Sequence, residues 1–281
     1  MSRKLLLKGM IMLTIAAAPV AQAERSRVLL QDGDTRIDVI VDGHGDAIVL
    51  LPSSQRGSDD LDAVAEALAE SGMRVLRPQP RGFGASRGEM TDLSLHVLAQ
   101  DVAATIRQLG GGRAIVAGHA YGHYVARVAD LDHPQLVRGV VMLASASASA
   151  DASLPASLDI AADSAQPEAR RLDALHRAFF AAGNDPRPWL EGWQPELAVV
   201  YRKAAKTPAR SIWWPVSHAP VLDLQGAEDP WRPRASASEV KDILKEKATV
   251  VVVPHASHAL PVEQPKAVAR AISEWAASVP R

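Results

Sequence analysis

The 281-residue sequence contains no cysteine. A disulfide framework, a cysteine nucleophile and a cysteine metal site are therefore excluded. A surplus of one charge is missing as well, because 31 basic and 32 acidic residues give a formal net charge of -1. This balance gives no sign of a nucleic-acid partner. A chain of this length that is 47% hydrophobic is long enough to bury one large core.

A hydrophobic run long enough to cross a bilayer comfortably is also missing. The apolar run at 10–20 follows a basic start, and residues 21–23 read Ala-Gln-Ala, which matches the small-x-small cleavage rule. We expect residues 1–23 to be a signal peptide. The mature protein would be periplasmic or secreted, with no stable membrane anchor after cleavage, and a retained anchor is the alternative.

Strand and helix patterns alternate along the rest of the chain. Alternating residues at 27–31 and 36–41, joined by Asp-Gly-Asp, predict an antiparallel hairpin. Further strands are expected in the apolar runs at 47–51, 73–77, 115–117, 139–143, 219–225 and 248–253. Between these runs, apolar residues recur at helical spacing. The alternation predicts an α/β fold with a mostly parallel, eight-stranded sheet flanked by helices.

A segment of different amino-acid composition separates the last two of these strands from the others. Residues 144–156 are rich in alanine and serine and predict a flexible hinge. Two helices are expected after it, at 172–180 and 195–205. The segment holds four of the six tryptophans, which are Trp189, Trp193, Trp213 and Trp214.

This difference in composition predicts a division of the chain. We expect residues 148–215 to form a helical cap over the active site, and residues 24–147 and 216–281 to form the core. The alternative is a helical insertion whose aromatic residues only pack it onto the core.

The stretch Gly118-His-Ala-Tyr-Gly122 lies between an expected strand and an expected helix. A Gly-x-X-x-Gly turn in this setting has the form of a nucleophile elbow. The two glycines leave room around a strained central residue. That central residue is Ala120, whose methyl group cannot attack a carbonyl.

Four motifs together resemble the α/β-hydrolase family, from about residue 26 to the end of the chain. They are Leu-Pro-Ser-Ser-Gln-Arg-Gly-Ser at 51–58, Arg-Gly-Phe-Gly-Ala-Ser at 81–86, the elbow at 118–122, and Gly-Ala-Glu-Asp at 226–229 with His-Ala-Leu-Pro-Val-Glu-Gln-Pro at 258–265. The elbow and cap also resemble a bacterial subgroup with Gly-His-Ala-aromatic-Gly at this turn. The resemblance implies an α/β-hydrolase fold, an esterase-like activity, no cofactor and no metal.

The resemblance further implies an acid and a base. Asp229 follows the strand at 219–225, at the carboxyl end of a parallel sheet where active-site residues gather. It would fix the tautomer of His258 and stabilise its imidazolium, and His258 would act as the general base. Glu228 and His255 are the neighbouring competitors for these two roles.

Two backbone amides are expected to form an oxyanion hole. One is the amide of Tyr121, directly after the elbow residue, and the other is the amide of Ser54 in the loop after the strand at 47–51. Ser53 and Ser54 could equally be plain turn residues.

His119 and His123 flank the elbow four positions apart, which on a helix is the spacing of a metal-binding pair. No metal site is expected, because His119 belongs to the turn. We expect both histidines to line the substrate pocket, with core packing as the alternative for His123. The aromatic residues expected to line the same pocket are Trp189, Trp193, Trp213 and Trp214.

Three interpretations of Ala120 remain open. In the first, His258 activates water or abstracts a proton from a small, largely apolar ester, lactone or amide, or Ser53, Ser54 or Ser145 replaces the nucleophile. In the second, the protein is an exported, non-catalytic small-molecule-binding protein with a degenerate triad. In the third, a native serine was deliberately replaced by alanine to trap a substrate. The first interpretation is preferred.

Overall fold

The computed structural model describes residues 25–280. The predicted signal peptide, residues 1–23, lies outside the described residues. Among the residues that are described, no helix is both long enough and apolar enough to cross a membrane.

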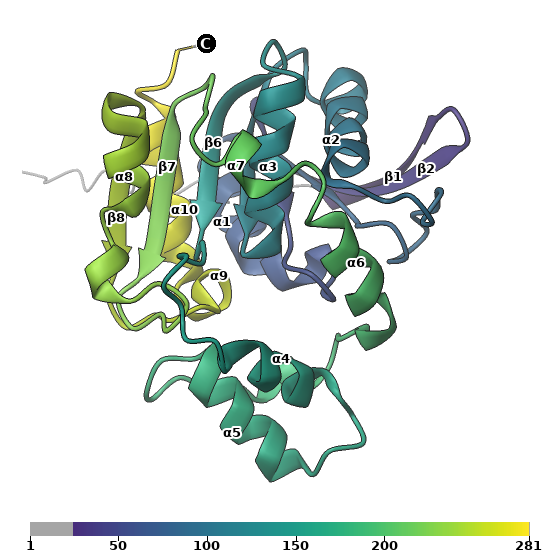
Figure 1. Cartoon of the computed structure of the whole chain (residues 1–281). Coiled ribbons are helices and arrows are strands. Elements are labelled where there is room, and N and C mark those ends of the chain that lie inside the picture. Colours follow the sequence, from purple (N-terminus) through teal and green to yellow (C-terminus); the bar gives the residue numbers. More distant parts are fainter. Residues whose placement is uncertain (1–24, 281) are drawn as a thin grey trace, which may run out of the picture.

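Within residues 25–280, eight strands form one sheet in the order β1-β2-β4-β3-β5-β6-β7-β8 (Figure 1). The pairs β1–β2 and β2–β4 are antiparallel, and every other neighbouring pair is parallel. The predicted fold class is therefore confirmed. The strands are β1 (Arg25–Asp32), β2 (Thr35–Asp42), β3 (Asp46–Leu51), β4 (Met73–Pro78), β5 (Ala114–His119), β6 (Val137–Leu143), β7 (Val221–Gly226) and β8 (Ala248–Val253).

Helices cover both faces of the sheet (Figure 1). On one face, α2 (Leu95–Leu109) and α3 (Tyr121–Asp132) share a buried apolar cluster with the strands. On the other face, α1 (Asp62–Glu70) and α10 (Pro265–Ala276) share a second cluster. The central strands are mostly apolar because both of their faces are covered.

The chain between β6 and β7 is a helical insertion. Its first two helices, α4 (Leu154–Ala162) and α5 (Glu168–Ala178), lie beyond the carboxyl ends of the strands, where the arrowheads of β7 and β8 point (Figure 1). They share a buried cluster of their own with the aromatic residues that follow them. The other elements of the insertion are η2 (Arg187–Leu190), η3 (Pro195–Leu197), α6 (Ala198–Ala204) and α7 (Arg210–Trp213).

The division of the chain into a cap at 148–215 and a core stays a prediction. Near the end of that range, Trp213 and Trp214 belong to the buried cluster of α2 and α3. Arg127 of α3, which is buried, donates to the carbonyl oxygens of Trp213 and Trp214 at 3.1 and 3.0 Å and anchors this segment. At the other end, α4 begins inside the alanine- and serine-rich stretch at 144–156 that was expected to be a hinge.

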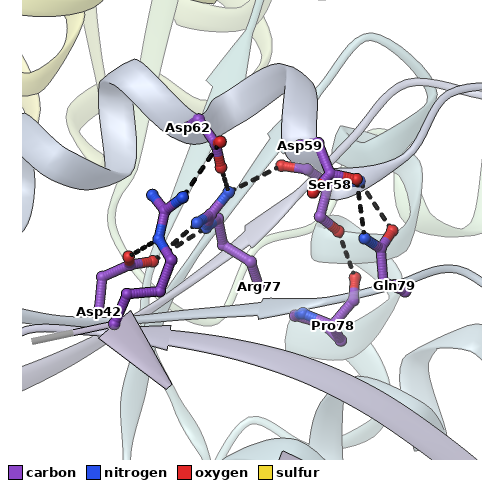
Figure 2. A network of polar contacts seen from close by, with 8 residues as sticks. Asp42, Ser58, Asp59, Asp62, Arg77, Pro78 and Gln79 are labelled. Carbon is purple, nitrogen blue, oxygen red and sulfur yellow. Dashed lines mark hydrogen bonds and ion pairs between the residues drawn. The ribbon is translucent and has the colours of Figure 1, made fainter. Parts of the chain in front are cut away.

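A buried network of polar contacts fixes the segment between β3 and α1 to β4 (Figure 2). Arg77 of β4 is fully buried and pairs with Asp42 at 2.9 Å and with Asp62. Ser58 donates its hydroxyl to the carbonyl oxygen of Pro78 at 2.7 Å. The loop that carries one predicted oxyanion donor is therefore held at its far end.

The remaining helices complete the fold, and all of them except η1, which lies between β3 and α1, follow β7 or β8. They include α9, which lies directly after the predicted base, and α8 beside the edge strand β8. Their bounds are η1 (Ser58–Leu61), η4 (Arg234–Ser236), α8 (Glu239–Leu244), η5 (Lys245–Lys247) and α9 (Leu260–Glu263).

Candidate active site

Ala120 stands at the tip of a tight turn between β5 and α3. Its backbone has φ 45° and ψ -112°, a conformation that residues other than glycine rarely adopt and that recurs at functional sites. A Cβ atom on Gly118 would lie 2.1 Å from the backbone carbon of Gly122, and one on Gly122 would lie 2.6 Å from the carbonyl oxygen of Leu51. Both positions therefore require glycine, and the turn has the form of a nucleophile elbow with a methyl group at its tip.

His258 and Asp229 form a buried pair. The Nδ1 atom of His258 lies 3.0 Å from Oδ2 and 3.2 Å from Oδ1 of Asp229. The backbone amide of Trp231 donates to Oδ1 of Asp229 at 2.8 Å and fixes the carboxylate. Because Nδ1 carries the proton that faces the carboxylate, Nε2 is the ring atom left to act as a base. The two competitors, Glu228 and His255, are exposed.

One cavity brings the expected chemical groups together. It has a volume of about 250 Å³, and Ala120, His258, Ser54 and Tyr121 all line it. The predicted base therefore faces the same space as the elbow methyl group and the two residues whose amides are the predicted oxyanion donors, and Asp229 lies behind it.

The surroundings of the two predicted donors suit a developing negative charge. Tyr121 is the first residue of α3, so its N–H has no acceptor within the helix and points along the positive end of the helix dipole. Ser54 precedes Gln55, whose φ of 63° marks a tight turn in the loop after β3. The assignment of the Ser54 and Tyr121 amides as donors stays a prediction.

The two histidines that flank the elbow were expected in the pocket, but neither lines the cavity. His119 donates Nε2–H to the carbonyl oxygen of His258 at 2.7 Å, and its burial lowers its pKa to about 3. His123 is fully buried, and its Nδ1–H donates to the carbonyl oxygen of Ala120. Its pKa is lowered by burial as well. Both rings therefore stabilise the site through hydrogen bonds to its backbone. Within residues 25–280, no group of three or more possible ligands could hold a metal ion.

The four tryptophans expected in the pocket lie elsewhere too. Trp213 and Trp214 pack in the core beside α3. Trp189 and Trp193 clamp the guanidinium of Arg56, whose Cζ atom lies 4.6 Å from each ring centroid. Arg56 is only 2% exposed and follows the predicted oxyanion loop directly. These indoles therefore serve to hold that loop against the insertion, because a buried guanidinium is stabilised between two aromatic faces.

Phe179 and Trp231 supply the aromatic wall that the tryptophans were expected to provide. The Trp231 ring stacks on the His258 ring at a centroid distance of 5.1 Å and an angle of 29°, and Phe179 lies 5.8 Å from the same ring. The position of Trp231, two residues after Asp229, was an available signal in the sequence. No comparable signal existed for Phe179, because it was expected inside a helix, whereas α5 ends at Ala178.

The three serines considered as replacement nucleophiles are placed differently. Ser53 and Ser54 line the cavity. Ser145 is fully buried, does not line the cavity and donates its hydroxyl to Oδ1 of Asp223 at 3.1 Å. Ser145 is therefore ruled out as a nucleophile for a ligand in this cavity.

Comparison with known proteins gives a match to one family model and a relative that is similar over a short segment. A model of the alpha/beta hydrolase family matches residues 44–271. Epoxide hydrolase A of Mycobacterium tuberculosis is 36% identical over 80 residues, which are 28% of this chain and 25% of that protein. The matched segment thus spans about a quarter of that relative's length.

Solved structures share the fold over most of the chain. A thermophilic esterase from Thermogutta terrifontis has a TM-score of 0.72 at 22% identity and covers 91% of this chain and 99% of its own. The carboxylesterase CesB from Bacillus subtilis has a TM-score of 0.72 at 17% identity, over 92% and 94%. Est816, an N-acyl homoserine lactone degrading enzyme, has a TM-score of 0.64 at 22% identity, over 88% and 100%. At these identities, the likeness concerns the fold alone.

Proposed function

The chain belongs to the α/β-hydrolase family, and on that basis we propose that it hydrolyses a small, largely apolar ester, lactone or amide by direct attack of water. The observation that carries the proposal is the hydrogen-bonded pair of Asp229 and His258, in which the His258 ring lines the same cavity as Ala120. Such a pair can act on a water molecule even where the elbow holds no hydroxyl.

The proposed reaction begins with a water molecule beside Nε2 of His258. His258 takes one proton as the water oxygen attacks the carbonyl carbon, and Asp229 stabilises the imidazolium that forms. The amides of Ser54 and Tyr121 hold the negative oxygen of the tetrahedral intermediate. When the intermediate collapses, His258 returns the proton to the leaving oxygen or nitrogen, and a carboxylic acid is released.

The cavity suits a small substrate with little charge. Its volume of about 250 Å³ lies below the usual range for drug-sized ligands, and Phe179 and Trp231 make much of its wall apolar. The one cation among the described residues that line it, Arg202, pairs with Asp159 at 3.0 Å. An uncharged or weakly acidic acyl compound fits these properties. The names of the similar proteins add lactones and epoxides to the set of compounds worth testing.

The proposal predicts that His258→Ala and Asp229→Asn each lower turnover at least about a hundredfold, the usual contribution of a positioned acid or base. The measurement is hydrolysis of a panel of short esters, lactones, amides and epoxides by the unaltered protein and the two variants. His255→Asn is the matched control, because His255 is exposed and its φ of 54° suits asparagine. Turnover that survives in His258→Ala would contradict the mechanism.

A second candidate function is favoured by Ala120 itself, since the elbow lacks an attacking atom. In this case the cavity binds a small molecule without converting it. Calorimetric binding of a panel compound that stays intact during long incubation would support this function. Binding that is always accompanied by hydrolysis would reject it.

We also propose export to the periplasm or the exterior, based on the basic start, the apolar run and the Ala-Gln-Ala site at 21–23. Protein isolated from its native host is predicted to begin at Glu24. N-terminal sequencing that returns Ser2 would contradict this proposal.

A further inference from the structure

A second, smaller cavity adjoins the active-site cavity. We call it the side slot, and it has a volume of about 50 Å³. Ser53, Ser54, Gln55 and Tyr121 line both spaces and form the wall that they share. Ala120 and His258 do not line the side slot. The slot therefore extends from the oxyanion side of the site, away from the base.

The wall of the side slot is mostly apolar. Leu98 and Val102 of α2 and Val125 of α3 line it. Asp101 is the one carboxylate among the described residues that line the slot. It is neutralised because Nε and Nη2 of Arg81 each donate to one of its oxygens at 2.8 Å. An alkyl chain in the slot would thus meet carbon surfaces and a charge that is already paired.

One polar group in this wall has no partner. The hydroxyl of Tyr121 is buried and makes no hydrogen bond to any of the residues 25–280, whereas the nearby hydroxyl of Tyr201 donates to the carbonyl oxygen of Arg81 at 2.8 Å. Burial also raises the pKa of Tyr121, so the hydroxyl keeps its proton. An unpartnered buried donor is costly, and a ligand atom that accepts a hydrogen bond would remove that cost.

We propose that the side slot binds the acyl chain of the substrate, with the Tyr121 hydroxyl donating to an oxygen on that chain. This inference rests on the proposed function. His258 must protonate the leaving group, so the leaving group lies on the His258 side of the carbonyl. The acyl chain then extends past Ser54 and Tyr121, which is where the side slot opens.

The size of the slot limits the length of the chain. A cavity needs a volume of roughly 10–15 Å³ to hold a group the size of a water molecule. A slot of about 50 Å³ therefore accepts about three or four carbon atoms beyond the carbonyl. The substrate class is a short, unbranched acyl compound, and an oxygen substituent such as a 3-hydroxyl or 3-oxo group would meet Tyr121.

The test measures the binding of carboxylate products by calorimetry, from acetate through butanoate and hexanoate to octanoate. Each methylene group that enters the slot should raise the affinity about fourfold, and the rise should stop near five carbons. For a 3-hydroxybutanoate probe, Tyr121→Phe should lower the affinity about fivefold, since it removes one hydrogen bond but keeps the backbone amide.

A matched pair of valines isolates the slot. Val125→Leu fills part of it and should weaken butanoate binding about tenfold relative to acetate binding. Val128 lies on the same helix, is also buried and does not line the slot, so Val128→Leu should leave the dependence on chain length unchanged. Circular dichroism of both variants checks that each one folds.

Three results would overturn the proposal: no alkanoate binds, the affinity keeps rising through octanoate, or the two valine variants behave alike. Failure of the proposed function is a separate outcome. Slot-dependent binding without hydrolysis would reject the hydrolysis and keep the slot. Hydrolysis without any dependence on Val125 would reject the slot alone.

Discussion

Replacing Ala120 by serine is expected to create a serine esterase. The unaltered protein should turn over simple activated esters only slowly, because its elbow has no hydroxyl to acylate and water must attack the ester directly. Ala120→Ser places an oxygen at the tip of an elbow whose glycines, helix and neighbouring base are in position. A gain of about a hundredfold or more is expected, part of the roughly millionfold that a full triad supplies in serine hydrolases.

The readout is hydrolysis of a p-nitrophenyl ester, together with covalent labelling of residue 120 by a phosphonate. Activity should be lost again when Ala120→Ser is combined with His258→Ala. Ala146→Ser is the matched control, because Ala146 lines the same cavity but lies outside the elbow, and it should gain nothing. Brisk ester hydrolysis by the unaltered protein would contradict the prediction and direct attention to Ser53 or Ser54 as the nucleophile.

If Ala120→Ser folds but neither labels nor hydrolyses esters, the cavity is not a vestigial triad site. Binding without chemistry would then be the better account of the protein. The added oxygen points into a cavity, so the free energy of unfolding should change by less than about 1 kcal/mol.

Gly118→Ala is expected to have the largest effect on stability. The new Cβ atom would lie 2.1 Å from the backbone carbon and 2.2 Å from the carbonyl oxygen of Gly122. Backbone atoms cannot rotate aside as a side chain can, so β5 and α3 must separate at the elbow. We expect a loss of at least about 3 kcal/mol in the free energy of unfolding, or no soluble protein. Denaturant unfolding measures the loss.

The control is Gly111→Ala. A Cβ atom at Gly111 meets nothing within 4 Å, and its φ of 67° should cost only about 1–2 kcal/mol, the penalty of left-handed backbone. Similar losses at the two positions would mean that the elbow tolerates a displaced helix. The close packing of strand and helix at this turn would then be irrelevant to the site.

The sequence by itself determined the parts of the site that are local. Gly118 and Gly122 predict the turn because its backbone leaves no room for a Cβ atom, a property of a few neighbouring residues. Asp229 and His258 follow apolar strands, and the carboxyl ends of parallel strands meet at one edge of a sheet. The alternation of strands and helices was also enough to predict the sheet itself, because burial on both faces makes the central strands mostly apolar.

Only the tertiary structure decided which aromatic residues face the ligand. Tryptophan content pointed to Trp189 and Trp193, but those rings enclose Arg56, a buried cation from a distant part of the chain that composition cannot pair with them. Phe179 and Trp231 reach His258 instead. An aromatic ring lowers its free energy by burial against any apolar or cationic partner, so its sequence position predicts that it will be buried but not which partner it will contact.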